Sequence, residues 1–416
     1  MQTTIHLNGT DYAWPERPIV VVCVDGGDPA YFEHGIATGL MPNVVRFARD
    51  GFFGEADGVV PSFTCPNNMS LITGAPASVH GISGNYYLDV ASGEAVVMTG
   101  PKLLRSRTLL ACFAEAGAKV VSITAKDKLR RQLGKDLDPS RGSMSFSAEF
   151  ASRCSLAENG LEDALGLTGM AQPDMYSMEL SLFVLEAGIR LLERDRPLIS
   201  FLSLTDYIQH KHAPGSPVAD RFHARLDACF GRLDALGAIV ALTADHGMND
   251  KALADGTPNV VYVQDLIDET FGAGRARVIC PITDAFVRHH GALGGFVRIW
   301  CTDPSLTAEA VVSRLTGVDG IAEALTRDQA CARFRLPPDR EGDVAVIATR
   351  GAVLGASRAD HDLTELQGER LRSHGGTSEA RVPIILNRPL NARYRERARA
   401  GMHSWEVFDY AINGTR

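Results

Sequence analysis

The sequence predicts an α/β protein with a mainly parallel central sheet flanked by helices, plus an inserted smaller α+β cap. Four apolar runs suit strands that are buried on both faces of a parallel sheet: residues 18–24, 118–125, 197–204 and 238–244. Helical patterns alternate with these runs: residues 41–48, 108–117, 176–194 and 221–236. Shorter alternating strands then indicate a different kind of unit after residue 271.

The predicted core comprises residues 1–271 and 339–416, and the predicted cap comprises residues 272–338. The elements expected in the cap are three strands and one helix: residues 275–279, 285–288, 295–300 and 306–315. Two later strands are expected in the core sheet, at 342–348 and 382–386. The basic segment 392–400 is expected to form a surface helix.

The amino-acid composition limits the classes of molecule that the protein is expected to bind. The chain has 416 residues, 45% hydrophobic and 22% charged, as is usual for a globular protein. A net charge of -8 argues against nucleic acid or an anionic membrane as partner, so an anionic substrate would need a metal or lysines. Residues 1–14 lack a signal-peptide pattern, no run is long enough to span a membrane, and eight scattered cysteines indicate reduced thiols. We expect a cytoplasmic protein, with a homodimer left open.

One hydroxyl stands at the centre of the functional prediction. Thr64 lies between Pro61 and Pro66, which exclude regular helix between them, and a helix is expected to start after Pro66. The amides of that helix would point back at Thr64, where an anion could bind. Taken alone, Thr64 would be interpreted as a helix cap.

Acidic residues and histidines follow the predicted strands. Each would be a turn residue if it stood alone, but the carboxyl ends of parallel strands meet at one edge of a sheet. Asp206 and His210 are four residues apart and would share one face of a helical turn. Mixed nitrogen and oxygen ligands suit zinc, and two zinc ions would lie on either side of Thr64. The six predicted ligands are Asp25, Asp206, Asp245, His210, His246 and His374.

Two lysines and an asparagine are candidates for substrate binding. Lys126 and Lys128 follow a predicted strand at alternate positions of an extended segment, so their side chains would face the same side and hold an anion. A solvated charged turn is the competing interpretation. Asn85 follows a glycine-containing stretch and could offer an amide donor, with a turn asparagine as the alternative.

These motifs, in this order, resemble the nucleotide pyrophosphatase/phosphodiesterases of the alkaline phosphatase superfamily. The nucleophile region is similar at 61–68 (PSFTCPNN), 71–74 (LITG) and 80–85 (HGISGN). The remaining motifs are similar at 206–210 (DYIQH), 245–248 (DHGM) and 373–375 (SHG). The resemblance spans most of the predicted core and implies an alkaline-phosphatase-like fold.

The resemblance also implies a role for each site residue. One zinc would be held by Asp25, Thr64, Asp245 and His246, and the other by Asp206, His210 and His374. Zinc would activate Thr64 as a nucleophile that passes through a phospho-threonine intermediate, and Asn85 would hold a phosphorus oxygen.

At Lys126 and Lys128, the sequence resembles the branch of this superfamily that hydrolyses the carbon–phosphorus bond of phosphonoacetate to acetate and phosphate. There the lysines are expected to bind the substrate. Breaking that bond expels a carbanion, which the neighbouring carboxylate can accept as an enediolate next to a cation. His212, His289 and His290 are further candidates for this role.

Four other functions compete with this interpretation. A phosphodiesterase or phosphomonoesterase could use the same pair of zinc ions, and a non-catalytic metal- or phosphate-binding protein would keep the ligands without needing an activated hydroxyl. A sulfatase needs Cys-x-Pro-x-Arg, whereas Cys65 is followed directly by Pro66. A haloacid-dehalogenase-type phosphonatase needs Asp-x-Asp, whereas Asp25 and Asp28 have the wrong spacing.

Overall fold

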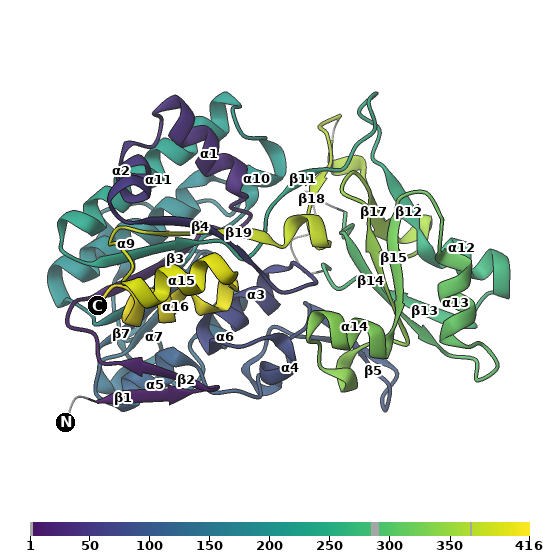
Figure 1. Ribbon diagram of the computed structural model, residues 1–416, viewed down its shortest axis with the longest axis horizontal. Coiled ribbons are helices and arrows are strands. Elements are labelled where there is room, and N and C mark those ends of the chain that lie inside the picture. The colour runs from purple at the N-terminus through teal and green to yellow at the C-terminus, as the bar shows by residue number, and fades with distance from the viewer. Residues whose placement is uncertain (1–2, 284–290, 367) are drawn as a thin grey trace.

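The computed structural model describes residues 3–283, 291–366 and 368–416 (Figure 1). It contains a seven-stranded sheet in the order β4-β19-β10-β3-β9-β7-β8. The four predicted parallel strands are β3 (Ile19–Cys23), β7 (Val120–Thr124), β9 (Ile199–Ser203) and β10 (Ile239–Thr243). β8 (Met144–Ser147) adds a fifth parallel strand at one edge. The predicted α/β fold with a mainly parallel sheet is confirmed.

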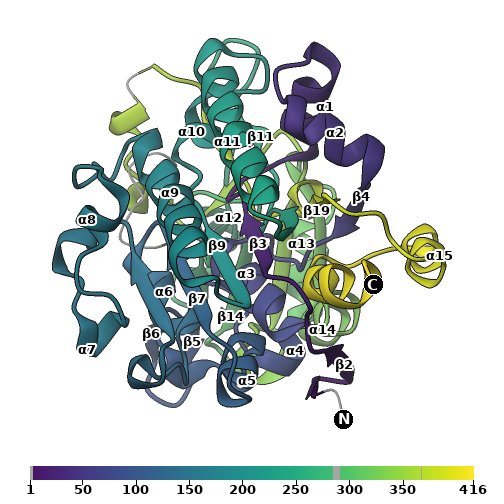
Figure 2. The same ribbon diagram turned by 90° about the vertical axis from the view of Figure 1, so that its left-hand side faces the viewer.

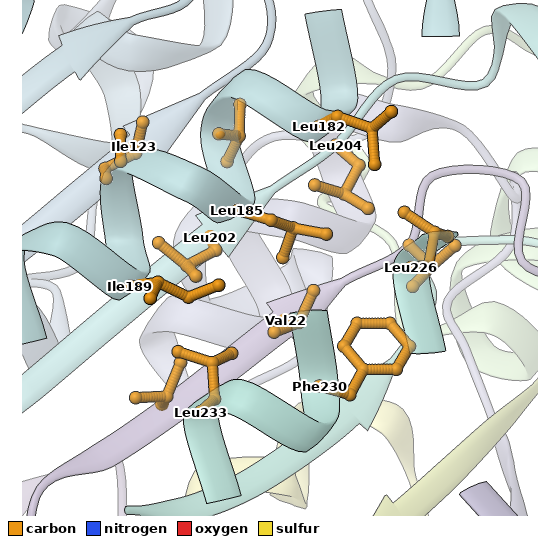
Figure 3. Packing of buried hydrophobic residues seen from close by; sticks show 14 of the residues in the cluster. Val22, Ile123, Leu182, Leu185, Ile189, Leu202, Leu204, Leu226, Phe230 and Leu233 are labelled. Atoms are coloured by element: carbon orange, nitrogen blue, oxygen red, sulfur yellow. The ribbon is translucent and has the colours of Figure 1, made fainter. Parts of the chain in front are cut away.

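Helices cover both faces of this sheet because successive side chains of a strand point to opposite sides. Val20 and Val22 of β3 pack into one apolar cluster, and Val21 and Cys23 pack into another. The first cluster includes α9 (Met178–Asp195) and α11 (Pro217–Ala235), which lie side by side in Figure 2. In Figure 3, Leu185, Ile189, Leu226 and Phe230 of these helices surround Val22.

The helices on the opposite face come from three parts of the chain. They include α3 (Thr64–Thr73), α5 (Leu109–Glu115), α6 (Asp127–Leu133) and α16 (Val407–Asp409). On the first face, α1 (Pro29–Thr38) and α2 (Pro42–Asp50) join α9 and α11. The predicted surface helix at the C-terminus is α15 (Ala392–Ala400), of which only Tyr394 is buried.

One strand of the main sheet runs against the others. β19 (Arg381–Leu386) is antiparallel to β10 and to β4 (Phe52–Asp57), and Ile384 lies opposite Thr243. The start of β19 therefore lies beside the carboxyl end of β10. A residue that precedes β19 in sequence thus reaches the same edge of the sheet as residues that follow the parallel strands.

A smaller unit lies beside the main sheet, on the right in Figure 1. Its antiparallel sheet has the order β13-β14-β16-β15: Ala276–Ile279, Phe296–Cys301, Val344–Ala348 and Ile321–Thr326. Three helices pack on it: α12 (Val263–Phe271), α13 (Ala308–Leu315) and α14 (Arg327–Phe334). Its apolar core is largely separate from the two clusters of the main sheet.

The strand at 342–348 was predicted to return to the core sheet, and this is wrong. β16 pairs with β14 and β15 instead. An apolar run indicates a buried strand but does not identify its neighbours, since the second sheet is also covered by helices. The division into residues 1–271 with 339–416 and residues 272–338 stays a prediction. The predicted strand at 285–288, like His289 and His290, lies outside the described residues.

Short strands join the two units. β11 (Asn249–Asp250) pairs with β18 (Arg372–Ser373), and β12 (Val260–Tyr262) pairs with β17 (Val353–Gly355). Throughout the described part of the chain, no helix combines the length and apolar character that a membrane crossing requires.

Candidate active site and metal centre

Thr64 is the first residue of α3 and the only residue of this helix that is not buried. The helix begins three residues earlier than predicted. Pro66 is accommodated because it lies in the first turn, where a backbone N–H has no partner within the helix. Thr64 therefore lies at a helix N-terminus, where amide groups and the helix dipole favour an anion.

Asp206, His210 and His374 form one compact group of buried side chains. His210 Nε2 lies 2.8 Å from Asp206 Oδ2, and His374 Nε2 lies 3.8 Å from the same oxygen. Asp206 precedes α10 (Tyr207–Lys211), and His210 lies one turn later on that helix. His374 follows β18 and precedes β19, so the reversed direction of β19 brings it to this edge. The three residues predicted for one metal are therefore adjacent.

Asp25, Asp206 and His246 form a second group that could hold a metal. His246 Nε2 lies 3.2 Å from Asp25 Oδ1 and 3.5 Å from the hydroxyl oxygen of Thr64. Asp245 Oδ2 is 3.7 Å from the same imidazole nitrogen. Asp206 thus belongs to both groups, whereas it was predicted as a ligand of one metal only. The assignment of Asp25, Thr64, Asp245 and His246 to one metal stays a prediction.

Gly26 allows the two groups to lie so close together. Its φ of +67° is in the left-handed region, and a Cβ at this position would lie 3.2 Å from Asp206 Cβ. The backbone N–H of Gly26 also donates to Asp245 Oδ1 at 3.2 Å. The loop after β3 therefore packs directly against the start of α10 and against the Asp245 carboxylate.

In each of the three imidazoles, the ring nitrogen other than Nε2 is held by a hydrogen bond. The Nδ1 atoms of His210, His246 and His374 donate to the carbonyls of Arg372, Gly247 and Ser62, at 2.8, 2.9 and 2.8 Å. A carbonyl can only accept, so Nδ1 carries a proton in each ring, and Nε2 is the atom that could bind a metal. The rings of His246 and His374 are stacked, with centroids 3.5 Å apart. This tautomer and orientation are those of histidines that bind a metal.

The charges of the site also fit a metal. Burial, followed by the nearby charges of Asp206 and Asp245, raises the pKa of Asp25 to about 8. Burial also raises the pKa of Asp245. Burial disfavours the charged form of His246, but the carboxylates of Asp245 and Asp25 outweigh it and raise the pKa to about 10. Clustered buried carboxylates need compensating positive charge, which a metal ion could supply in place of these protons, and carboxylates together with imidazoles are a zinc-type donor set.

For chelator-treated protein, we expect the free energy of unfolding to fall as the pH rises from about 6.5 to 8. The folded state keeps protons on Asp25 and His246 in this window, because their pKa values are raised to about 8 and about 10. The unfolded chain releases them, which weakens folding by up to about 1.4 kcal/mol per pH unit for each group.

Thermal unfolding in EDTA at pH 6.5, 7.25 and 8 measures this effect. Burial and the neighbouring imidazoles lower the pKa of His374, which opposes the trend only below pH 6.5. Saturating zinc should remove the decline, because metal binding favours the deprotonated ligands. A melting temperature that rises with pH in EDTA would contradict this account of the site.

The candidate substrate residues have different surroundings. Lys126 precedes α6 (Asp127–Leu133), and its Nζ lies 3.8 Å from Asp206 Oδ1, so it belongs to the candidate metal site. Lys128 is half-buried on the first turn of α6. The predicted extended segment is therefore wrong, because a helix starts at Asp127 directly after the strand. His212 is half-buried just after α10.

Asn85 is buried in the loop before β5 (Tyr86–Asp89). Its Nδ2 donates to the carbonyl of Ile282 at 3.0 Å, which leaves the second N–H of the amide for another acceptor. Its role toward a phosphorus oxygen stays a prediction.

Asn68 is a residue whose role the sequence analysis missed. It lies one helical turn after Thr64, and its Nδ2 donates to the Thr64 carbonyl at 3.0 Å and to Asp245 Oδ2 at 3.3 Å. Its Oδ1 accepts from the Ser203 hydroxyl at 3.1 Å. Asn68 therefore ties the candidate nucleophile to a candidate metal ligand. Its position four residues after Thr64, within a predicted helix, is the signal that could have identified it.

Comparisons with known proteins agree with this geometry. The sequence profile of the Type I phosphodiesterase / nucleotide pyrophosphatase family matches residues 19–377. The crystal structure of phosphonoacetate hydrolase from Sinorhizobium meliloti 1021 in complex with phosphonoformate is 44% identical, with a TM-score of 0.94 and 100% of both chains covered. The complex of that enzyme with phosphonoacetate matches at 42% identity and a TM-score of 0.93, again with 100% of both chains covered.

Murine ectonucleotide pyrophosphatase / phosphodiesterase 5 is a more distant neighbour. It is 14% identical, with a TM-score of 0.63 and 96% of each chain covered, and this likeness supports the fold alone. The family profile and the full-length matches to phosphonoacetate hydrolase support a closer relationship. The chain belongs to the Type I phosphodiesterase / nucleotide pyrophosphatase family of the alkaline phosphatase superfamily, and within it to the phosphonoacetate hydrolases.

Proposed function

We propose that this protein hydrolyses the carbon–phosphorus bond of phosphonoacetate to acetate and phosphate. The observation that carries the proposal is the position of the Thr64 hydroxyl, 3.5 Å from His246 Nε2 and next to two buried Asp/His groups. Phosphonoacetate is the ligand of the S. meliloti enzyme, to which the chain is 42% identical over its whole length.

We propose two zinc ions as the cofactor. Asp206, His210 and His374 would hold one, and Asp25, Asp245, His246 and Thr64 would hold the other. Bound zinc would lower the pKa of the Thr64 hydroxyl and compensate the negative charge of the phosphonate. Two features support this assignment: the buried carboxylates, and the imidazole Nε2 atoms that remain available because Nδ1 holds each ring.

The Thr64 hydroxyl would release its proton to solvent, and its Oγ1 would attack phosphorus and form an oxygen–phosphorus bond while the phosphorus–carbon bond breaks. The bonding electrons pass to the methylene carbon and are delocalised onto the carboxylate as an enediolate, which takes up a proton to give acetate. Water then hydrolyses the phospho-threonine, which releases phosphate and restores the hydroxyl. Asn85 would donate its second amide N–H to a phosphorus oxygen.

Lys126 and Lys128 would bind the substrate carboxylate and stabilise the enediolate. Replacing either lysine with alanine should lower kcat/KM for phosphonoacetate by about 10- to 100-fold, the effect of losing a charge-assisted hydrogen bond. The loss should be several-fold smaller for p-nitrophenyl phosphate, which lacks the carboxylate. Phosphate release and nitrophenolate release measure the two rates.

Lys119→Ala is the matched control, because Lys119 precedes the same strand at the opposite end and pairs with Asp195 at 3.8 Å. It should leave both rates unchanged. Equal losses on the two substrates in the Lys126 and Lys128 variants would refute their role in carboxylate binding.

A phosphodiesterase or phosphomonoesterase is the second candidate, because the matching family profile is named for diester and pyrophosphate hydrolysis. The same nucleophile and metal groups would serve it. Rates on phosphonoacetate, p-nitrophenyl phosphate and bis-p-nitrophenyl phosphate separate the two functions. Higher kcat/KM on either ester than on phosphonoacetate would favour the second candidate.

We also propose a cytoplasmic enzyme with a small anionic phosphonate as its partner and with neither nucleic acid nor membrane. The eight scattered cysteines of the sequence and the net charge of -8 support this proposal. A homodimer is open to test by light scattering.

A further inference from the structure

We propose that Arg298, held by Glu341, is a positioning residue that fixes the loop carrying Asn85. Arg298 lies on β14 and Glu341 precedes β16, with 0% and 2% of their side chains exposed. Nε and Nη2 of Arg298 donate to the two carboxylate oxygens of Glu341, at 2.5 and 2.7 Å. Nη2 also donates to the Ser83 carbonyl at 2.8 Å. The inference rests on the proposed role of Asn85 toward the phosphonate.

The smaller unit holds the Asn85 loop at further points. The backbone N–H of Asn85 donates to the Pro281 carbonyl at 2.9 Å, and its side chain donates to the Ile282 carbonyl at 3.0 Å. The same unit also contacts the candidate metal site, because Gly295 N–H donates to the His374 carbonyl at 2.8 Å. The smaller unit thus holds both the Asn85 loop and the segment that carries His374.

Gly84 shows how closely the loop approaches Arg298. A Cβ at this position would lie 2.8 Å from Pro281 Cβ and 3.1 Å from Arg298 Nη1. Such contacts would require a shift of the loop that carries Asn85. Ser83, Gly84 and Asn85 are therefore packed directly on the residues that fix them.

The ion pair between Arg298 and Glu341 is better explained as a device that orients the Arg298 guanidinium than as a contribution to the stability of the fold. A buried pair of charges gains little over apolar residues of similar volume, because both ions lose their hydration. Its planar geometry, however, fixes the guanidinium in one orientation. The bidentate contact with Glu341 directs Nη2 at the Ser83 carbonyl, two residues before Asn85.

The test is a double-mutant cycle that removes the pair without leaving a lone buried charge. The variant Arg298→Met with Glu341→Leu is compared with Asn85→Ala and with the triple variant. We expect kcat/KM for phosphonoacetate to fall about tenfold or more in the pair variant, the effect of a misplaced hydrogen bond to a charged group. In the Asn85→Ala background, the same change should cost less than about threefold, because the contact is already lost.

A second measurement does not depend on turnover. The Kd for phosphonoformate, by calorimetry on the zinc-loaded protein, should rise about tenfold in the pair variant and in Asn85→Ala, with little further rise in the triple variant. Arg327→Met is the control, because Arg327 pairs with Asp343 at 2.7 Å in the same unit and is partly exposed. It should leave kcat/KM and Kd within about twofold of the wild type.

Three results would overturn the inference. The first is a folded pair variant with wild-type kcat/KM while Asn85→Ala is impaired, which leaves the proposed function intact. The second is a loss of similar size in the wild-type and Asn85→Ala backgrounds, which indicates a general structural role. The third is a wild-type kcat/KM in Asn85→Ala, which also refutes the proposed role of Asn85. If the pair variant does not fold, Arg298→Lys, which loses the bidentate contact, is judged by the same criteria.

Discussion

Replacing Thr64 with alanine is expected to lower kcat for phosphonoacetate by at least about 10⁴-fold, the scale seen when a catalytic nucleophile is removed. The Thr64 hydroxyl is the only one placed both at the start of α3 and within 3.5 Å of His246 Nε2 in the part of the chain that the structure describes. The substitution removes one hydroxyl and one methyl group at a half-buried position, so the fold should be unaffected.

Two measurements accompany the rate. Zinc content should stay near the wild-type value, because the carboxylates and imidazoles are unchanged. Thr64→Ser, which keeps a hydroxyl at the same position, is the matched variant and should retain turnover well above that of Thr64→Ala. Wild-type turnover in Thr64→Ala would refute the proposed nucleophile, and no turnover in the wild type would favour a binding protein.

Replacing Asp206 with asparagine is expected to lower kcat/KM by at least about 10³-fold and to reduce the zinc bound with His210 and His374. Asp206 belongs to both groups of candidate ligands, and its Oδ2 lies 2.8 Å from His210 Nε2. Asparagine preserves the shape of the side chain and removes its charge. A loss of activity in this variant would therefore result from the missing charge of Asp206 and not from altered packing.

Asp227→Asn is the matched control for this variant. Asp227 is also buried, but its carboxylate accepts the backbone N–H groups of Asn43 and Val44 at the start of α2, at 3.1 and 2.8 Å. Its replacement should lower the melting temperature while zinc stoichiometry stays at the wild-type value. A Asp206→Asn protein that keeps both zinc ions and full activity would contradict the ligand assignment.

The central sheet could be predicted because its strands are short apolar runs that each end in a polar cluster. The run at 18–24 predicts β3, and Asp25 follows it directly. Parallel strands place such residues at one edge, so Asp25, Asp206 and Asp245 could be grouped without any knowledge of contacts. His374 was included because it precedes the last predicted strand, but the sequence does not show why it reaches this edge, since its position depends on the antiparallel direction of β19.

The parts that were wrong or missed depend on tertiary contacts. Lys128 was placed on an extended segment because charge spacing alone does not reveal that α6 starts at Asp127. The run at 342–348 was predicted to lie in the wrong sheet, because the sequence of an apolar strand does not indicate which strand it pairs with. The proximity of Asp206 to Asp25 and His246 was missed, because sequence spacing cannot show that Gly26 lets Asp25 approach it.

Zinc-edge anomalous diffraction from crystals of the zinc-loaded protein tests the central claim most directly. We predict two anomalous peaks, one bound by Asp206, His210 and His374 and the other between Asp25 and His246 within reach of the Thr64 hydroxyl. A single peak, or peaks away from these residues, would contradict the two-zinc site on which the proposed reaction depends.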